Sequence, residues 1–539
     1  MLTGFIKRFL LRQTQGILGG GPPKEIRQIP RSRSYPDDLL NRPAEIRKAI
    51  EKNPRNPDLW IELGYASLNI ESIDSAIESF EKALAIDPDR HQAISGLAGG
   101  AVAQGQVDKA IALYRRALEI APADPVTFQN LLFLMLCSGE ASDEDIFDWH
   151  KRFARQFEVP LLAGTHMEYP NPVDPERILR VGYVSPDFRG HVVGRCIAPV
   201  LEKHDRTRFA IHCYYNNDIE DDLTESIRNS CDKWLNIRHL NDEQFCEEVR
   251  KDQIDILVDL SGHTPGNRLL AFARKPAPVQ VSYLDYSATT GLSSIDYRLT
   301  DRLCDPERIA DPYYSETLYR LPATYWLYKP STMYGGNAIK ANGDGHIIFA
   351  CLNSFYRVTD TAIQLWAEIL RHLPSAKLVF IGVPVGSTRN ALLERFGNLG
   401  IGADRIELFG LLTYENYIDL IRATDIALAP FPYNGAMTLL DCLWNGVPVV
   451  ALEGGKTFRS RMGNSILTTL GLDNLIAKNR EDYIGIALKI AGKRRWRNEL
   501  RMTLRDRIKD SVLYQDSTFT VAMEDAYRQM WRTYCEAYA

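Results

Sequence analysis

The stretch APFPYNGAMTLLDCLWNGVPVV, residues 429–450, combines features that bind anions. It reads as an apolar strand that ends in Pro and Asn-Gly, followed by a helix from about Ala436 and a second apolar strand. Backbone N–H groups at a helix start lack partners within the helix, and the helix dipole makes that end electropositive. This order of elements therefore indicates a phosphate site, although many α/β proteins have such a turn with nothing bound.

Three other predicted strands end in residues that bind anions or carry out acid–base chemistry. RVGYVS ends in PDFRGHVVGR, which places His191 on a loop, and IDILVDL ends in SGHT, which places His263 on another. IIFACLN ends in SFYRVTD, which supplies Tyr356 and Arg357. A single loop histidine is more often structural than catalytic, but two histidines, an arginine and a phosphate-type turn together favour an active site.

Parallel sheets are the elements that would bring these loops together. After Pro172, strand-like segments alternate with helical patterns, which is typical of α/β units. The first predicted sheet uses residues 178–185, 209–216, 254–262 and 279–286, and the second uses residues 346–353, 377–383, 406–410, 425–431 and 448–452. Two such domains, joined over residues 328–345, predict a cleft between them where the strands end.

The segment before the sheets repeats itself every 34 residues, as the positions of Pro54, Pro88 and Pro122 show. The matched positions are Trp60 with Ile94, Leu63 with Leu97, Gly64 with Ala98, Ala76 with Ala110, Phe80 with Tyr114 and Ala83 with Ala117. The pattern is similar to the tetratricopeptide repeat, a pair of helices packed through small residues. Two units are clear and two are degraded. We expect them to hold a protein partner or substrate, with a purely packing role as the alternative.

Composition places the chain among globular proteins of several domains, with 539 residues, 45% hydrophobic and 25% charged. A net charge of -5 argues against a broad nucleic-acid-binding face. The nine Cys are scattered without a CxxC pair, which favours a reducing compartment, and we expect the cytoplasm. No HExxH motif or Cys/His cluster predicts a metal site.

The N-terminal stretch MLTGFIKRFLLRQTQGILGGG is amphipathic and basic, and it has two interpretations. It could lie on an anionic membrane surface. Alternatively, it is a frayed tail before the Arg- and Pro-rich residues 22–42. No apolar segment approaches the roughly 18 to 20 residues that span a bilayer. The oligomeric state leaves no mark in the sequence.

Taken in order, these motifs resemble the O-linked N-acetylglucosamine transferase family. The resemblance covers about residues 45–535 and rests on RVGYVSPDFRGH, ILVDLSGHT, RKPAPVQVSYLDY, TTGLSSIDYRLTD, YSETLYRLP, ACLNSFYRVTDTAIQLWAEIL, PFPYNGAMTLLDCLWNGVPVV and FRSRMGNSILTTLGL. The SPINDLY O-fucosyltransferases, the plant-type branch, share this architecture. The resemblance implies glycosyltransferase family 41, with a GT-B fold of two Rossmann-like domains facing a cleft.

With this family in view, four regions are expected along the chain. They are a flexible tail over 1–42, a tetratricopeptide-repeat domain over 43–160, an acceptor-side Rossmann-like domain over 165–330, and a sugar-nucleotide domain with closing helices over 346–539. The resemblance implies inverting transfer of N-acetylglucosamine from UDP-N-acetylglucosamine to Ser or Thr of protein acceptors, without a metal. The alternatives are GDP-fucose as the donor, because DLSGHT and PAPVQV look equally like the fucosyl branch, and a catalytically weak scaffold.

The donor site must stabilise the negative charge of a leaving nucleotide diphosphate. Without a divalent ion, a helix N-terminus, hydroxyl groups and a cation have to do so. The N–H groups near Met437 and the Thr438 hydroxyl fit the first two roles, and Arg357 fits the third, where the family typically has Lys. The family resemblance implies that Asp441 bonds the ribose and that Tyr417 lies near the base. The remaining donor-site candidates are Leu412, Asn434, Gly435 and Tyr356.

On the acceptor side, His191 matches a family histidine within reach of the sugar or the hydroxyl. It could act as a general base, or it could orient the sugar while the leaving phosphate takes the proton. His263, Gln280 and Tyr286 are candidate wall residues, with a structural role favoured for Gln280. The chain departs from the family at Ala436 and Met437, where relatives have His-Thr or Thr-Thr, so one or two contacts to the diphosphate are expected to be missing.

Overall fold

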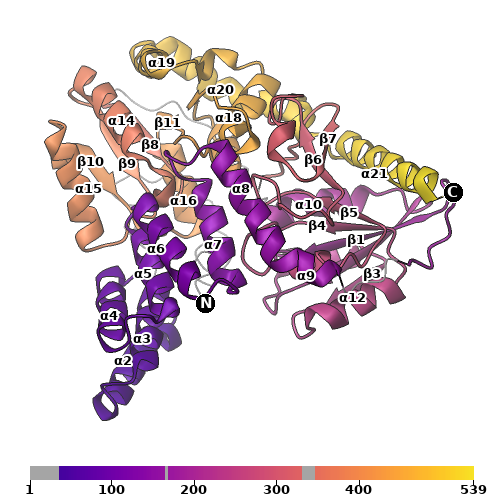
Figure 1. Cartoon of the computed structure of the whole chain (residues 1–539). Helices are drawn as coiled ribbons and strands as arrows, with labels where there is room; N and C mark the ends of the chain where they lie inside the picture. The colour runs from indigo at the N-terminus through magenta and orange to yellow at the C-terminus, as the bar shows by residue number, and fades with distance from the viewer. Residues whose placement is uncertain (1–34, 164–167, 331–345, 539) are drawn as a thin grey trace. The chain divides into compact units, whose positions relative to one another are not determined.

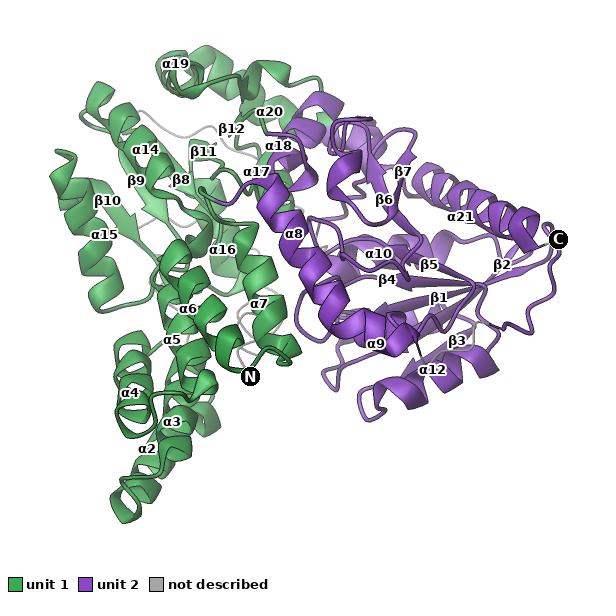
Figure 2. Ribbon diagram, viewed as in Figure 1, with its two compact units in different colours: residues 1–140, 332–454, 471–507 green, residues 141–331, 455–470, 508–539 purple. Residues whose placement is uncertain are grey.

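The computed structural model describes residues 35–163, 168–330 and 346–538. The chain forms two compact units (Figure 2). Unit 1 contains residues 1–140, 332–454 and 471–507, and unit 2 contains residues 141–331, 455–470 and 508–539. The helical repeats therefore share a unit with the second sheet, and not with the sheet that follows them in the sequence. The predicted N-terminal membrane contact, and most of the predicted join between the sheets, lie outside the described residues.

The repeats form six helices in unit 1 (Figure 1). They are α2 (Asp37–Lys52), α3 (Pro57–Asn69), α4 (Ile73–Ile86), α5 (His91–Ala103), α6 (Val107–Ile120) and α7 (Pro125–Met135). Phe80 explains the need for small residues, because a Cβ atom at Gly64 would lie 2.5 Å from its ring and one at Gly96 would lie 2.3 Å from it. The ring of Phe80 thus fills the space between α3 and α5, and its matched residue Tyr114 is equally buried.

Unit 2 contains a sheet of seven strands, and all paired neighbours in it are parallel. Its order is β3 (Lys233–Asn236), β2 (Phe209–Tyr215), β1 (Leu179–Ser185), β4 (Ile256–Asp259), β5 (Val279–Ser282), β6 (Tyr297–Asp301) and β7 (Thr317–Leu321). The four predicted strands are present, while β3, β6 and β7 were not predicted. Strand β6 was not predicted because polar residues, among them the buried Arg298 and Thr300, interrupt its apolar pattern.

Unit 1 contains the second sheet, which has six strands and is also parallel. Its order is β10 (Ile406–Leu408), β9 (Lys377–Phe380), β8 (Ile348–Cys351), β11 (Ile426–Leu428), β12 (Val449–Leu452) and β13 (Ile476–Ala477). All five predicted strands are present, and all except β12 end earlier than predicted. The strand β13 has only two residues, which leaves no pattern to detect. A helical solenoid followed by two parallel α/β sheets is the predicted fold class.

The helices and short turns outside the repeats connect the strands. Those of unit 2 are α8 (Asp143–Phe153), the π-helix η2 (Ala154–Glu158), α9 (Val159–Leu162), α10 (Val192–Lys203), α11 (Asp222–Asn229), α12 (Asp242–Lys251), α13 (Leu269–Phe272), η3 (Asp311–Tyr313), α18 (Phe458–Thr469), η7 (Val512–Tyr514) and α21 (Asp516–Tyr538). Those of unit 1 are η4 (Phe355–Arg357), α14 (Asp360–His372), α15 (Ser387–Asn398), η5 (Ala403–Arg405), α16 (Tyr414–Ala423), α17 (Ala436–Trp444), η6 (Asp473–Leu475) and α19 (Arg480–Gly492). Helix α20 (Arg494–Asp510) begins in unit 1.

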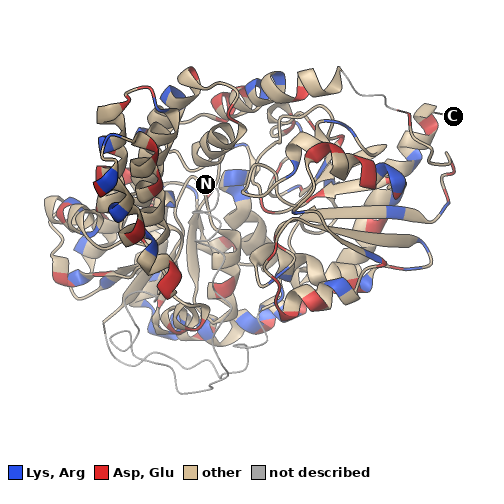
Figure 3. Cartoon of the chain, turned by 90° about the horizontal axis from the view of Figure 1, so that it is seen from below, with Lys and Arg blue, Asp and Glu red and all other residues tan. Residues whose placement is uncertain are grey.

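Helix α20 is rich in arginine, and three of its arginines point inward. Arg497 donates to the carbonyl oxygens of Ile490 and Ala491 at the end of α19, and Arg501 donates to those of Arg422 and Thr424 at the end of α16. Arg505 likewise donates to the carbonyl oxygen of Trp444, the last residue of α17. Cations stabilise helix C-termini, where carbonyl groups lack partners. These three arginines therefore have a structural role. Figure 3 shows basic and acidic residues interspersed over the helices.

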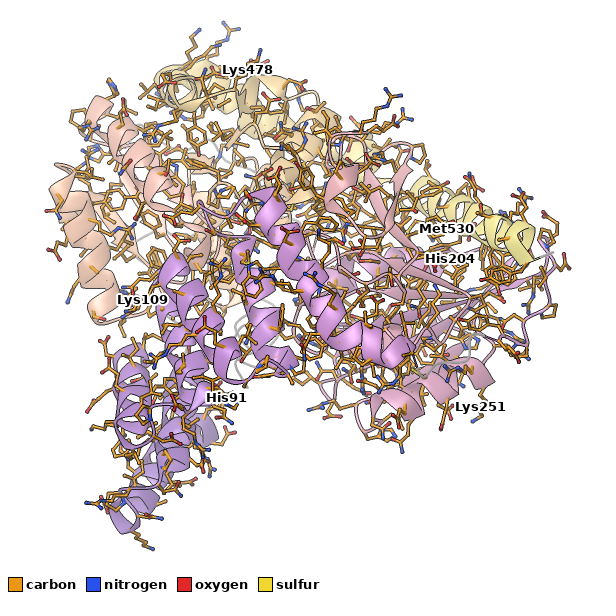
Figure 4. All side chains as sticks on the ribbon, viewed as in Figure 1. His91, Lys109, His204, Lys251, Lys478 and Met530 are labelled. Atoms are coloured by element: carbon orange, nitrogen blue, oxygen red, sulfur yellow. The ribbon has the colours of Figure 1, made fainter. Side chains whose placement is uncertain are left out.

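Helix α21 is fixed to the first sheet by a buried polar network around His204, which Figure 4 labels. The Nδ1 atom of His204 lies 2.9 Å from Oε1 of Glu524 on α21, and its Nε2 atom lies 2.9 Å from the hydroxyl oxygen of Tyr183 on β1. Within the described ranges no helix is long and apolar enough to cross a bilayer, and no three His, Cys, Asp or Glu side chains are grouped as metal ligands.

Candidate functional site

The loop that follows β8, residues 353–359 and hereafter the η4 loop, carries a cation without a carboxylate partner. Arg357 is partly exposed, and its guanidinium carbon lies 4.3 Å from the ring centre of Tyr433 and 5.8 Å from that of Tyr356. Among the described residues no Asp or Glu pairs with Arg357, and its buried Nε atom has no hydrogen-bond partner there. The positive charge is therefore available to an anion.

Gly435 brings the start of α17 against this cation. A Cβ atom at Gly435 would lie 1.7 Å from Oδ1 of Asn353 and 3.0 Å from Nη1 of Arg357, so only glycine fits. Gly435 supplies no side-chain cap for α17, whose first N–H groups lack partners within the helix. The turn before it is held by Asn434, which donates from Nδ2 to the carbonyl oxygen of Pro430 at 2.9 Å. We call Arg357, Gly435 and the first N–H groups of α17 the α17 anion site.

Tyr417 lies beside two other predicted donor-site residues on α17, Thr438 and Asp441. Tyr417 of α16 is buried, and its hydroxyl group lies near the Thr438 side chain. Burial raises the pKa of Tyr417 well above its ordinary value, and the carboxyl group of Asp441 adds to this rise. Leu412 is also buried, just before the N-cap of α16, and Met437 is partly exposed. The structure thus brings Tyr417 to Thr438, whereas its predicted position near a base stays a prediction.

In unit 2, His191 lies at the N-terminus of α10, at the end of a tightly folded loop. Its Nδ1 atom accepts a hydrogen bond from the backbone N–H of Val193 at 3.3 Å and lies 3.7 Å from Oδ2 of Asp187. Asp187 in turn pairs with the buried Arg189 at 3.0 Å. A Cβ atom at Gly194 would lie 2.1 Å from the carbonyl oxygen of Arg189, so the loop lies directly on the first turn of the helix. The ring of His191 is consequently held on its Nδ1 side.

The protonation pattern of His191 follows from these contacts. A neutral imidazole carries one proton, and a ring nitrogen that accepts a hydrogen bond does not hold it. Because Nδ1 accepts from the backbone, the hydrogen-bond pattern assigns the proton of the neutral ring to Nε2. Nε2 is then a hydrogen-bond donor, and it becomes a proton acceptor only after the tautomer changes.

The predicted wall residues His263 and Tyr286 form an aromatic cluster with His150 inside unit 2. The ring centre of His263 lies 5.2 Å from that of His150 and 5.1 Å from that of Tyr286. The Nε2 atom of His263 lies 2.7 Å from the carbonyl oxygen of Thr290, and Nε2 of His150 lies 2.6 Å from the hydroxyl oxygen of Tyr286. Burial lowers the pKa of His150 to about 4 and that of His263 well below its ordinary value. These contacts show both residues held in the interior of unit 2, which favours a structural role for His263.

Gln280, the third predicted wall residue, is fully buried on β5. Its side-chain nitrogen donates to the carbonyl oxygen of Phe272 at 2.9 Å and to that of Ser294 at 2.8 Å. These bonds tie β5 to the two loops beside it. They agree with the structural role that the sequence favours for Gln280.

Sequence reasoning missed two polar residues near these loops, Asp259 and Asn353. Asp259 ends β4 and accepts hydrogen bonds from the N–H groups of Gly262 at 2.7 Å and Ser261 at 3.2 Å. Burial raises the pKa of Asp259 to about 7, so this carboxyl group titrates near neutral pH. Asp259 lies in the quoted motif DLSGHT and Asn353 in the quoted motif ACLNSF. Their residue types alone did not single them out as candidate site residues within these motifs.

Comparison with known proteins identifies the family to which the sequence is similar. The sequence matches the model of Glycosyl transferase family 41 over residues 156–341 and 339–523, and two tetratricopeptide-repeat models over residues 44–91 and 71–132. A mutant of the Thermobaculum terrenum O-GlcNAc transferase is 34% identical, superimposes with a TM-score of 0.87, and the match covers 93% of this chain and 96% of that one. This match confirms the predicted GT-B fold class with preceding repeats.

Curated plant proteins are also similar. SPINDLY of Solanum lycopersicum is 34% identical over 427 residues, which are 78% of this chain and 45% of that protein. SEC of Arabidopsis thaliana is 28% identical over 370 residues, which are 66% of this chain and 37% of that protein. Both are named as probable UDP-N-acetylglucosamine–peptide N-acetylglucosaminyltransferases. The chain thus spans less than half the length of these relatives.

Proposed function

The chain belongs to glycosyl transferase family 41, and from that membership we propose that it transfers a sugar from a nucleotide sugar to Ser or Thr hydroxyl groups of proteins. The proposed donor is UDP-N-acetylglucosamine, because the plant relatives are named for it. The proposed acceptors are proteins or peptides, with the helical repeats contributing to their binding.

The α17 anion site is the observation that carries this proposal. In the proposed reaction, the acceptor oxygen attacks the anomeric carbon from the face opposite the diphosphate, which inverts the configuration at that carbon. The carbon–oxygen bond to the diphosphate breaks, and its electron pair passes to the terminal phosphate oxygen. Arg357 and the N–H groups of α17 would stabilise this developing charge without a metal ion.

The acceptor hydroxyl must also lose its proton, and the geometry of His191 bears on where the proton goes. With Nδ1 accepting from the backbone, Nε2 of the neutral ring is a donor. We therefore favour a role in which His191 orients the sugar through a donated hydrogen bond while the leaving phosphate takes the proton. This supports one of the two roles that the sequence leaves open. With that role, His191→Ala should lose most of its turnover and still bind the nucleotide.

A second candidate donor is GDP-fucose, because the segments DLSGHT and PAPVQV resemble the fucosyl branch of the family as much as the N-acetylglucosaminyl branch. The two donors differ in both base and sugar, so binding experiments can separate them.

The test is calorimetric titration of the full chain with UDP, GDP, UDP-N-acetylglucosamine and GDP-fucose, without added metal. A preference for the uridine compounds supports the first donor, and a preference for the guanosine compounds supports the second. Arg357→Ala should weaken binding of the preferred diphosphate by about tenfold or more. The matched control is Arg371→Ala, because the Arg371 side chain lies in the last turn of α14 and donates to the carbonyl oxygen of Leu399, just after α15. No binding of any of the four would favour a scaffold instead.

A further inference from the structure

The helical repeats touch the η4 loop directly, although more than 200 residues of sequence separate them. At Gly105, where φ is +71°, a Cβ atom would lie 2.8 Å from the ring of Phe355. At Gly139, just after the repeats, a Cβ atom would lie 3.5 Å from Cγ2 of Thr359. The turn between α5 and α6 and the segment after α7 therefore cover two ends of the η4 loop.

Helix α7 contacts the centre of the same loop. The ring centre of Phe133 lies 6.1 Å from that of Tyr356, and the two rings meet edge to face. Tyr356 is buried, and the guanidinium carbon of Arg357 lies 5.8 Å from its ring centre. The contact chain from the repeats to the α17 anion site thus has only two steps, from Phe133 to Tyr356 and from Tyr356 to Arg357.

A second contact ties the repeats to the same unit. The carboxylate of Asp74, at the start of α4, accepts hydrogen bonds from the N–H group and the hydroxyl group of Ser387. Ser387 begins α15, whose N-cap residue Gly386 supplies no side-chain cap. An acidic side chain from the repeats therefore caps a helix of the second sheet, which fixes the repeats against this part of unit 1.

From these contacts we propose that the repeats position the nucleotide-binding cation, with Phe133 and Gly105 as positioning residues that act through Tyr356 and Phe355. This inference rests on the proposed function, because it assigns Arg357 to a nucleotide diphosphate. The solenoid is then part of the donor site's support, in addition to any acceptor that it binds. Side chains held by packing keep a charged group in its binding geometry, whereas a loosened support lets it move.

The experiment compares Phe133→Ala with the full wild-type chain by calorimetry, using UDP, GDP and the matching nucleosides. Removing the ring should weaken binding of the preferred diphosphate by about five- to tenfold, which is the scale of a lost edge-to-face pair. The nucleoside lacks phosphate and should bind equally well to both proteins. Phe133→Tyr keeps the ring and should restore diphosphate binding.

Phe80→Leu is the matched control, because Phe80 fills the space between α3 and α5 within the repeats. It changes packing between α3 and α5 without removing a side chain that contacts the η4 loop, and it should leave diphosphate binding within twofold of the wild type. Equal losses in Phe133→Ala and Phe80→Leu, or no loss in Phe133→Ala, would overturn the positioning role. A wild-type chain that binds neither UDP nor GDP would instead overturn the proposed function, and this inference with it.

If Phe133→Ala does not fold, amide hydrogen exchange of the wild type alone tests the positioning role. Binding of the preferred nucleotide diphosphate should slow amide hydrogen exchange in α7, residues 125–135, because the fixed Arg357 restrains Tyr356 and its neighbour Phe133. Unchanged exchange in α7, together with slowed exchange at the start of α17, would overturn the inference.

Discussion

Oδ1 of Asn353 occupies the space that a Cβ atom on residue 435 would need, at only 1.7 Å from its position. Asn353 lies at the start of the η4 loop, two residues after β8, and Gly435 directly precedes α17. The two loops that form the α17 anion site therefore interlock at this point. The Asn353 oxygen is buried and has no hydrogen-bond partner among the described residues.

Gly435→Ala should separate these loops and weaken binding of the preferred nucleotide diphosphate by more than about tenfold, because the new Cβ atom displaces Asn353 and contacts Arg357. Calorimetry measures the affinity. The control is Gly397→Ala within α15, where a Cβ atom would meet nothing within 4 Å. That variant should keep wild-type affinity and gain up to about 1 kcal/mol of helix stability. Normal affinity in Gly435→Ala would contradict the interlocked arrangement.

His191→Asn tests whether the ring or only the helix cap matters. Asn is a good N-cap residue, so it can accept from the Val193 N–H and preserve α10. We expect turnover of the proposed donor to fall by about a hundredfold or more while nucleotide affinity and the melting temperature stay near wild type. Near-normal turnover would show that the Nε2 atom of His191 has no part in the reaction.

Asp259→Asn should remove a pH-dependent component of stability. The folded state raises the pKa of Asp259 to about 7 from 3.8, so it retains this proton to higher pH than the unfolded chain does. The free energy of unfolding of the wild type should therefore fall as the pH rises from 4 towards 7, and the variant lacks this component. From pH 5 to pH 7 the free energy of unfolding of the wild type should fall by about 2 to 3 kcal/mol relative to the variant, which guanidinium unfolding can measure. Identical pH profiles would contradict the assignment.

His150→Gln should reveal a dependence of the opposite sign. Burial lowers the pKa of His150 to about 4 from 6.5, so the unfolded chain takes up this proton at a higher pH than the folded chain. The wild type should lose stability as the pH falls from 6.5 towards 4, by about 2 to 3 kcal/mol at pH 4.5 relative to the variant. A wild type that gains stability against His150→Gln on acidification would rule out a buried neutral ring.

The sequence predicted nine strands and the repeats because long apolar runs and a 34-residue period are local signals. The strands it missed, β3, β6, β7 and β13, are short or carry polar side chains such as Arg298. The loops bearing His191 and Arg357 were also predictable, since each follows an apolar strand. The contact between Asn353 and Gly435, the protonated nitrogen of His191 and the position of the repeats beside the second sheet depend on tertiary packing, which no local pattern encodes.

The contact between Gly105 and Phe355 joins residues 250 positions apart, with the whole first sheet between them in the sequence. A ribosome adds about 5 to 20 residues per second, so Phe355 is synthesised roughly 10 to 50 seconds after the repeats. During this interval the nascent chain exposes the surface that later covers the η4 loop. Completion of unit 1 is thus a late, long-range event in biosynthesis, and the repeats need a transient protector or enough stability of their own until their partner emerges.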